Sequence, residues 1–161
     1  MENKQKLRKS AQSVQNTLDA KGIQTTVIEL PASTRTAHDA AQAIGCTIEQ
    51  IVKSLVFKTK ESNMPILVLA SGPNRVNESA IEAMVGEKIV KADADFVREV
   101  TGFAIGGIPP IGHKQALKTF IDKDLMALHD LWAAAGTPNA VFNLKSSDLQ
   151  ALTKGIIITV C

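Results

Sequence analysis

The spacing of apolar residues along the chain predicts where its first helix and strand lie. Between residues 7 and 18, apolar side chains recur at intervals of four, three and four, which places them on one stripe of a helix. This helix is expected over 3–20 and should end near Gly22. The following segment, 23–30, is enriched in β-branched residues and stops at a proline, so it is expected to form a strand.

Capping residues indicate two short helical elements after that strand. Thr36 can cap a helix with an alanine-rich face that ends at Gly45. Thr47 is followed three residues later by Gln50, which is the spacing of a capping box. A further single helical turn is therefore expected there.

Two apolar, β-branched segments in the middle of the chain, 51–58 and 65–70, are typical of core strands joined by a hairpin. Asn77 then caps a helix that should turn Ile81 and Met84 inward. The pattern beyond it predicts helices over 94–100 and 147–154 and strands over 118–122, 131–135, 140–144 and 156–160. About seven strands and at least five helices result, in an order too irregular for a doubly wound sheet.

Length and composition fit one mixed α/β domain over 1–161, with 45% hydrophobic and 21% charged residues. No apolar run approaches the ~20 residues that cross a bilayer, and the lysine-rich start lacks a secretory apolar core, so a cytoplasmic protein is expected. Cys46 and Cys161 form no close pair, which argues against a disulfide framework or a thiol-rich zinc site.

The charge of the chain is close to balanced, at +2, with an excess of basic residues among the first ten positions. A weak attraction to phosphate is expected only where lysines such as Lys53, Lys58 and Lys91 converge in space, and a solvated helix face is the favoured interpretation of the N-terminal lysines. The chain has no tyrosine and a single tryptophan, so it lacks aromatic platforms on which unpaired bases would stack. Sequence-specific reading of single-stranded RNA is not expected.

The segment 106–113 contains three glycines and two prolines and directly follows an apolar stretch. Glycine permits close approaches and proline fixes φ, so this is a shaped loop. Its free N–H groups could hold a carbonyl or phosphate oxygen in a concavity. The alternative is a structural turn, and His113 could accordingly contact a substrate or brace that turn.

Lys53 stands in the middle of an apolar strand, where it must either lie on an exposed face or point into a polar pocket. Burial without a compensating anion is costly, so an inward lysine usually serves a phosphate or carboxylate ligand. The three histidines have no metal-ligand spacing, and no metal site or cofactor is expected. A Gly-x-Ser-x-Gly nucleophile motif is absent as well.

Three segments together resemble the YbaK/prolyl-tRNA-synthetase editing-domain family of aminoacyl-tRNA deacylases: 34–37, 51–57 and 100–113. The resemblance extends in the right order from about Thr17 to Val160. It implies a compact, mainly antiparallel or mixed twisted sheet flanked by helices. It also implies metal-independent hydrolysis of the ester that joins a wrong amino acid to tRNA.

Carried over residue by residue, the resemblance assigns catalytic roles to Lys53, Gly106 and Gly107. Lys53 would anchor the terminal adenosine, and loop N–H groups would receive the developing oxyanion. A free hydroxyl of the substrate's ribose would help to position the attacking water. The expected substrate-binding residues are Thr34, Arg35, Thr36, Ile51, Ser54, Leu55, Ile105, Pro110 and His113.

The size and polarity of a small pocket would select the amino acid, which the resemblance limits to alanine, cysteine, serine, threonine or a small non-protein residue. The expected substrate is mischarged tRNA, with tRNA for proline as the leading carrier, and an aminoacyl-tRNA synthetase is a candidate partner; no membrane association is expected. The alternative is a non-catalytic module that binds tRNA or a nucleotide beside a synthetase.

Overall fold

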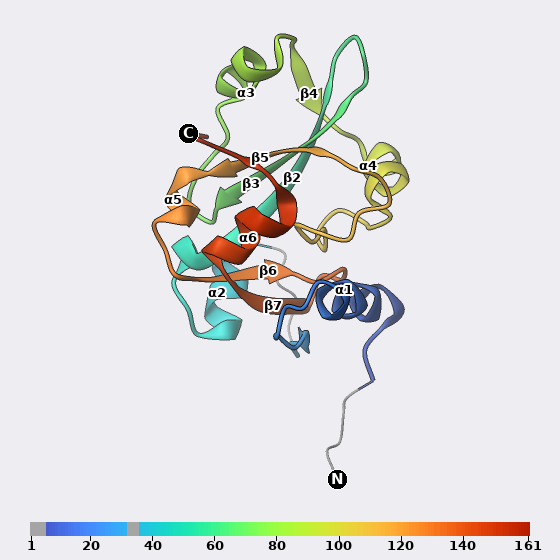
Figure 1. Ribbon diagram of the computed structural model, residues 1–161, viewed down its shortest axis with the longest axis vertical. Coiled ribbons are helices and arrows are strands. Elements are labelled where there is room, and N and C mark those ends of the chain that lie inside the picture. The colour runs from blue at the N-terminus through green and yellow to red at the C-terminus, as the bar shows by residue number, and fades with distance from the viewer. Residues whose placement is uncertain (1–5, 32–35) are drawn as a thin grey trace.

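Within residues 6–31 and 36–161, which the computed structural model describes, eight strands form one mixed sheet (Figure 1). These strands are β1 (Ile28–Glu29), β2 (Ile51–Thr59), β3 (Pro65–Ser71), β4 (Ile89–Lys91), β5 (Lys118–Asp122), β6 (Asp130–Ala134), β7 (Ala140–Lys145) and β8 (Ile156–Ile158). They follow the order β1-β7-β6-β2-β3-β5-β8, and β4 pairs with β2. β2 runs antiparallel to β3 and β4 but parallel to β6, so the mixed fold class predicted from the sequence is confirmed.

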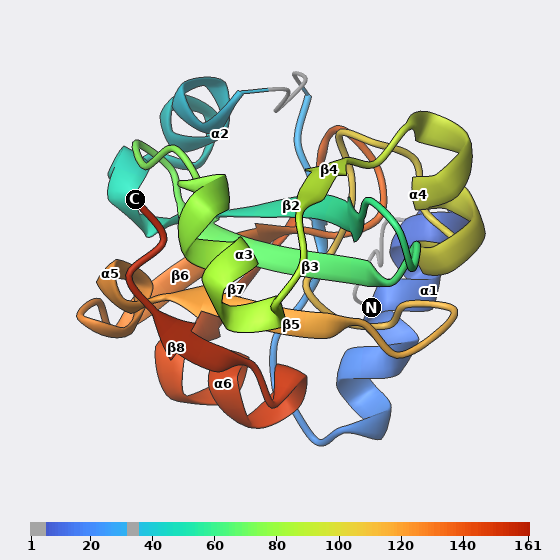
Figure 2. The same cartoon turned by 90° about the horizontal axis from the view of Figure 1, so that it is seen from above.

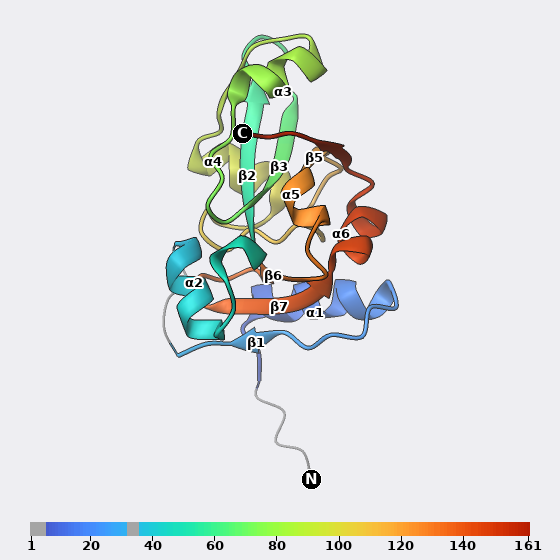
Figure 3. The ribbon, with the colours of Figure 1, turned by 90° about the vertical axis from the view of Figure 1, so that its left-hand side faces the viewer.

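Helices cover both faces of this sheet. They are α1 (Lys9–Ala20), α2 (Ala37–Ile44), α3 (Glu78–Val85), α4 (Ala94–Thr101), α5 (Lys123–Met126) and α6 (Ser146–Thr153), with the 3-10 turn η1 (Ile48–Gln50) before β2. Figure 2 shows α3 across the face of β3, and Figure 3 shows α1 at the opposite end of the molecule, beside β7. None of the described helices is long and apolar enough to span a membrane.

Side chains on the two faces of β2 enter different parts of the core. Val52 and Val56 join the large cluster that contains the buried stripe of α1, including Val14 and Leu18. Phe57 lies on the other face and packs with residues of β3 and α3. Because strand side chains alternate in direction, Lys53 shares the face of Phe57, and the even-numbered residues share the face of α1.

The edge of β2 that faces away from β3 is covered at its two ends only. Ile51 and Val52 pair with β6, and residues 57–59 pair with β4. Ala92 N–H also donates to Val56 O at 3.2 Å. Between these contacts, no strand in the described part of the chain pairs with residues 53–55 on this edge. The sheet therefore has a gap beside the centre of β2.

The local signals identified most elements correctly. Thr36 Oγ1 accepts from Asp39 N–H at 3.0 Å at the start of α2, and Gly45 ends that helix with a φ of 86°. Gln50 Oε1 accepts from Thr47 N–H at 3.0 Å, which completes the capping box before β2. The predicted hairpin is formed by β2 and β3.

Several expectations were wrong in detail. The first helix was expected over 3–20, but residues 6–8 are not helical and α1 begins at Lys9. Only Ile28 and Glu29 of the segment 23–30 pair as a strand, because the Gln15 side chain of α1 bonds the backbone of Thr25 and Val27 instead. Met84 is 48% exposed and does not face the core. The short elements β4 and α5 were not anticipated, since three or four residues carry too little periodicity.

Candidate functional site

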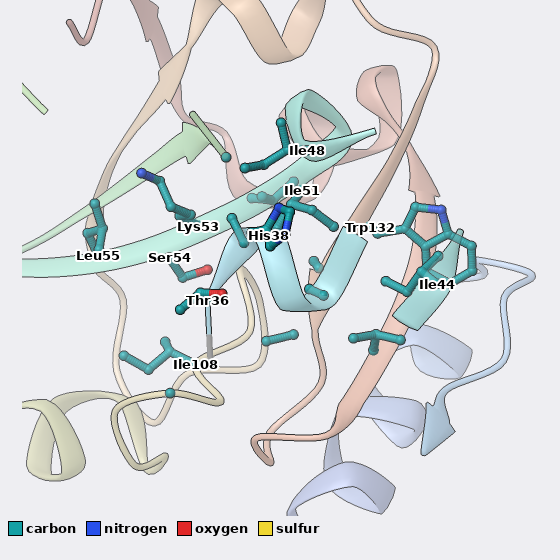
Figure 4. Close-up of a pocket in the computed structure, with 18 of the residues that line it drawn as sticks. Thr36, His38, Ile44, Ile48, Ile51, Lys53, Ser54, Leu55, Ile108 and Trp132 are labelled. Carbon is teal, nitrogen blue, oxygen red and sulfur yellow. The ribbon is translucent and has the colours of Figure 1, made fainter. Parts of the chain in front are cut away.

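A cavity of about 540 Å³ lies where α2, β2, β6 and the loop 104–113 meet (Figure 4). Its wall is mostly apolar: Ala37 and Ala40 of α2, Ile51 of β2 and Trp132 of β6 all line it. We refer to it as the first cavity. A concave apolar wall with few polar groups is suited to a small organic ligand.

The structure brings most of the sequence-predicted site residues to this cavity. Among the described residues, those that line it are Thr36, Ile51, Lys53, Ser54, Leu55, Ile105 and Gly106. Gly107, Pro110 and His113 line neither this cavity nor its neighbour. Thr34 and Arg35 lie outside the described residues.

A second cavity, of about 570 Å³, adjoins the first along the gap in the sheet. The two cavities share Lys53, Ser54, Leu55, Ile105 and Ile108 as a common wall. The second cavity differs in its other residues, which include two exposed cations and one exposed carboxylate: Arg75, Lys91 and Glu78. Together with Lys53, basic groups outnumber acidic ones in its lining.

Lys53 is held by the turn that follows β3. Its ammonium group donates to the carbonyl oxygen of Asn74. The Asn74 side chain donates in turn to Asp122 and Asp124, at 2.8 Å each. Asp122 is buried and also accepts from Ser71 N–H at 3.0 Å. This chain of hydrogen bonds positions the ammonium group.

Burial lowers the pKa of Lys53 below its ordinary value of 10.5, and the nearby Arg75 cation lowers it further, while Asp122 acts in the opposite direction. Arg75 has no hydrogen-bond or ion-pair partner for its guanidinium group among the described residues. Two cations therefore lie near each other without a compensating anion on Arg75. Such an arrangement favours an anionic ligand.

Lys53 and the glycine loop approach the first cavity from different faces of β2. Figure 4 shows Lys53 and Ser54 leaving the strand on opposite sides, with Ile108 on the side of Ser54. Both Lys53 and Gly106 still border the same cavity. The gap beside β2 makes this arrangement feasible, because a ligand there can contact both faces at the open edge.

The loop contains a tight turn in which Gly107 N–H donates to Ala104 O at 3.2 Å. Gly106 has a φ of 101°, which is suited to glycine, and no atom lies within 4 Å of where its β-carbon would be. A β-carbon on Gly107 would lie 2.8 Å from the backbone of Thr137. The N–H of Gly107 is thus engaged in the turn, and its Cα lies against the backbone of Thr137.

His113 braces the loop. Its Nε2 lies 2.7 Å from Pro109 O. Since a carbonyl oxygen can only accept, Nε2 carries the proton and donates it to this hydrogen bond. Burial lowers the pKa of His113 below 6.5, with the bond to Pro109 opposing the shift. Pro110 beside it is buried.

In the described ranges, no group of three or more His, Cys, Asp or Glu side chains is arranged to hold a metal ion.

Ser54 presents an unusual polar atom. Its Oγ is buried and has no hydrogen-bond partner, and no other buried side-chain nitrogen or oxygen in the described part of the chain shares this state. Buried hydroxyl groups are normally hydrogen-bonded, so an orphaned one calls for an explanation.

Sequence reasoning missed the groups that support the predicted residues. Arg75 and the carboxylate of Asp122 carry no local motif, and Lys91 is notable in the sequence only as one of several lysines that could converge with Lys53 and attract phosphate. Asn74 follows the Ser-Gly-Pro break after β3, and Asp122 ends an apolar strand. A polar residue directly at a strand end was the available signal, but only the pairing of β3 with β5 brings these two residues together.

Residues 31–152 match the family model described as the aminoacyl-tRNA editing domain. The match covers most of the chain, so the chain belongs to this family. Members edit mischarged tRNA, and the chain is accordingly an aminoacyl-tRNA deacylase.

Individual relatives agree with this assignment. The chain is 44% identical to a solved structure described as a candidate trans-editing enzyme for prolyl tRNA synthetase, with a TM-score of 0.91 over 96% of this chain and 98% of that one. It is 29% identical to the uncharacterized protein YwhH of Bacillus subtilis over 84% of this chain and 86% of that protein. It is also 32% identical to a proline–tRNA ligase of Brachyspira hyodysenteriae, over 60% of this chain but only 17% of the ligase.

Proposed function

We propose that this deacylase acts in trans on tRNA for proline that carries a small wrong amino acid, alongside prolyl-tRNA synthetase. The observation that carries the proposal is that Lys53 and Gly106, far apart in sequence, border one cavity. The relatives described as prolyl-tRNA ligase and as a trans-editing enzyme support the choice of tRNA.

The first cavity is assigned to the amino-acid side chain. Its lining by Ala37, Ala40, Ile51 and Trp132 offers apolar contact, and among the described lining residues only Lys53 carries a formal charge. A pocket of this kind discriminates by size, and one methylene contributes about 1–3 kcal/mol. Small side chains are therefore the expected occupants.

The second cavity is assigned to the nucleotide end of the substrate. Lys53, Arg75 and Lys91 border it, and a phosphodiester would supply the anion that Arg75 lacks. Lys53 borders both cavities, so it would hold the terminal adenosine at the point where sugar and amino acid are joined. Holding the ester in a fixed orientation would lower the entropic part of the activation barrier and so raise the rate of hydrolysis.

Hydrolysis then needs an attacking water and a donor for the oxyanion. Water adds to the ester carbonyl carbon, the carbonyl oxygen takes up negative charge, and the bond to the ribose oxygen breaks as that oxygen regains a proton. Gly106 N–H is the proposed oxyanion donor, since it donates no hydrogen bond to another described residue and borders the cavity. The free ribose hydroxyl is proposed to position the water, without a metal ion.

The test is a deacylation panel with alanyl-, cysteinyl-, seryl-, threonyl- and 2-aminobutyryl-tRNA for proline, with correctly charged prolyl-tRNA as the control. We expect hydrolysis of at least one mischarged species, unchanged by a metal chelator, and little hydrolysis of prolyl-tRNA. If the protein bound these tRNAs and shielded every ester from hydrolysis, the non-catalytic alternative would replace the proposal.

A further inference from the structure

Ser54 lies in the common wall of the two cavities and carries the orphaned buried hydroxyl. Removing a hydroxyl from water without giving it a partner destabilises a fold. No described group bonds this hydroxyl, although Ser54 borders both cavities. The hydroxyl is therefore free to donate to a ligand that reaches the common wall.

The main chain of Ser54 also points into the gap. In an antiparallel ladder, alternate residues direct their N–H and C=O groups to the same edge. Val56 O accepts from Ala92 N–H on the β4 edge, so the peptide groups of Ser54, two residues earlier, face that edge as well. No strand in the described ranges pairs with Ser54 there.

We propose, resting on the proposed function, that Ser54 is a second donor to the ester carbonyl. Its position carries the argument: the first cavity is assigned to the amino acid and the second to the nucleotide, and Ser54 borders both where the ester would lie. Its side chain leaves β2 on the side of Ile108, which belongs to the loop of Gly106 (Figure 4). Ser54 Oγ–H and Gly106 N–H then stabilise the same developing oxyanion.

The same geometry argues against Ser54 as a nucleophile. A serine nucleophile needs a base within hydrogen-bond reach, and Ser54 Oγ has no partner among the described residues. Water is therefore the attacking group, and the ester carbon never becomes attached to the protein. The electron pair of the broken bond leaves with the ribose oxygen.

Ser54→Ala separates this role from a structural one, because activity and stability should change in opposite directions. Loss of an oxyanion donor is expected to lower kcat about 100-fold with a small change in KM. Loss of the orphaned hydroxyl should leave Tm unchanged or raise it by about 2–4 °C. Ser54→Thr keeps a hydroxyl on a β-branched residue that suits a strand, and should recover part of kcat.

Ser71→Ala is the matched control for stability. Its hydroxyl is also at the site side of the sheet but donates to Glu49 O at 2.7 Å, so its removal should lower Tm. Full kcat in Ser54→Ala, or a lowered Tm as in Ser71→Ala, would overturn the proposal. Isolation of an aminoacyl ester on Ser54 after an acid quench would overturn it in favour of nucleophilic catalysis.

The two hypotheses fail in distinguishable ways. If the wild-type protein hydrolysed no mischarged tRNA, the proposed function would fail. If the wild type were active and Ser54→Ala equally so, only the role of Ser54 would fail.

Discussion

The two cavities share five wall residues but differ in what completes them. The first is closed mainly by apolar side chains of α2 and β6, whereas the second combines the charged side chains of Arg75, Glu78 and Lys91 with apolar ones such as Val76 and Val97. Both adjoin the edge of β2 that, among the described residues, is unpaired between its contacts with β6 and β4. Lys53 therefore borders an apolar compartment on one side and a compartment with an excess of basic groups on the other.

Lys53 belongs to both compartments, so its replacement should have the largest effect. Lys53→Ala removes the group that we propose to hold the adenosine, and we expect kcat/KM to fall by about 100-fold or more in single-turnover deacylation, with the fold retained. Lys53→Arg keeps the charge and should lose less. If folded Lys53→Ala hydrolysed the ester at the wild-type rate, Lys53 would not anchor the adenosine.

Replacing Gly106 should mainly lower the catalytic rate, whereas replacing Gly107 should mainly lower the stability of the fold. Gly106→Val has space for its side chain but strains a φ of 101°, so it should reduce kcat at least 10-fold with a modest fall in Tm. Gly107→Val meets the Thr137 backbone at 2.8 Å and should chiefly destabilise, by about 1–3 kcal/mol. The comparison requires rates and thermal melts for both variants, and a rate loss confined to Gly107→Val would reverse the two assignments.

Filling the first cavity should change selectivity. Ala40→Val adds two methyl groups to its wall, and hydrolysis of the larger 2-aminobutyryl ester should fall roughly 10- to 100-fold more than that of the alanyl ester. Ala43→Val on the exposed side of α2 is the matched control, because it carries the same loss of helix propensity. If the two variants changed the selectivity ratio equally, the first cavity would not be the binding site of the amino-acid side chain.

Changes to residues that border the second cavity alone should have the smallest effect on activity, and they should alter the binding of tRNA more than kcat. Arg75→Ala should raise KM for aminoacyl-tRNA several-fold and reduce the slope of log K against log salt by about 1. Aminoacyl-adenosine without a 5′-phosphate should be unaffected. Arg98→Ala, exposed on α4 and outside both cavity linings, is the control. A KM shift for the phosphate-free substrate as well would argue against a phosphate contact at Arg75.

The sequence predicted the local parts of this molecule well, because caps, hairpins and glycine turns depend on neighbouring residues. The helix after Thr36, the capping box at Thr47, the β2–β3 hairpin and the shaped loop all follow from short-range chemistry. The sequence also identified Lys53 as unusual in an apolar strand, although the alternation of side chains did not decide whether it faces solvent or a pocket. The two-residue β1 and the short β4 were not predictable, since they depend on partners far away in the chain.

By itself, the sequence determined which residues are chemically notable: Lys53 in an apolar strand and the glycine loop 106–113. Tertiary structure alone decided that β2 keeps an open edge at 53–55, that Arg75 lies near Lys53, and that Gly107 packs while Gly106 borders the cavity. The physical reason is that strand pairing and cavity walls are set by contacts between distant segments, for which no short stretch of sequence carries the information.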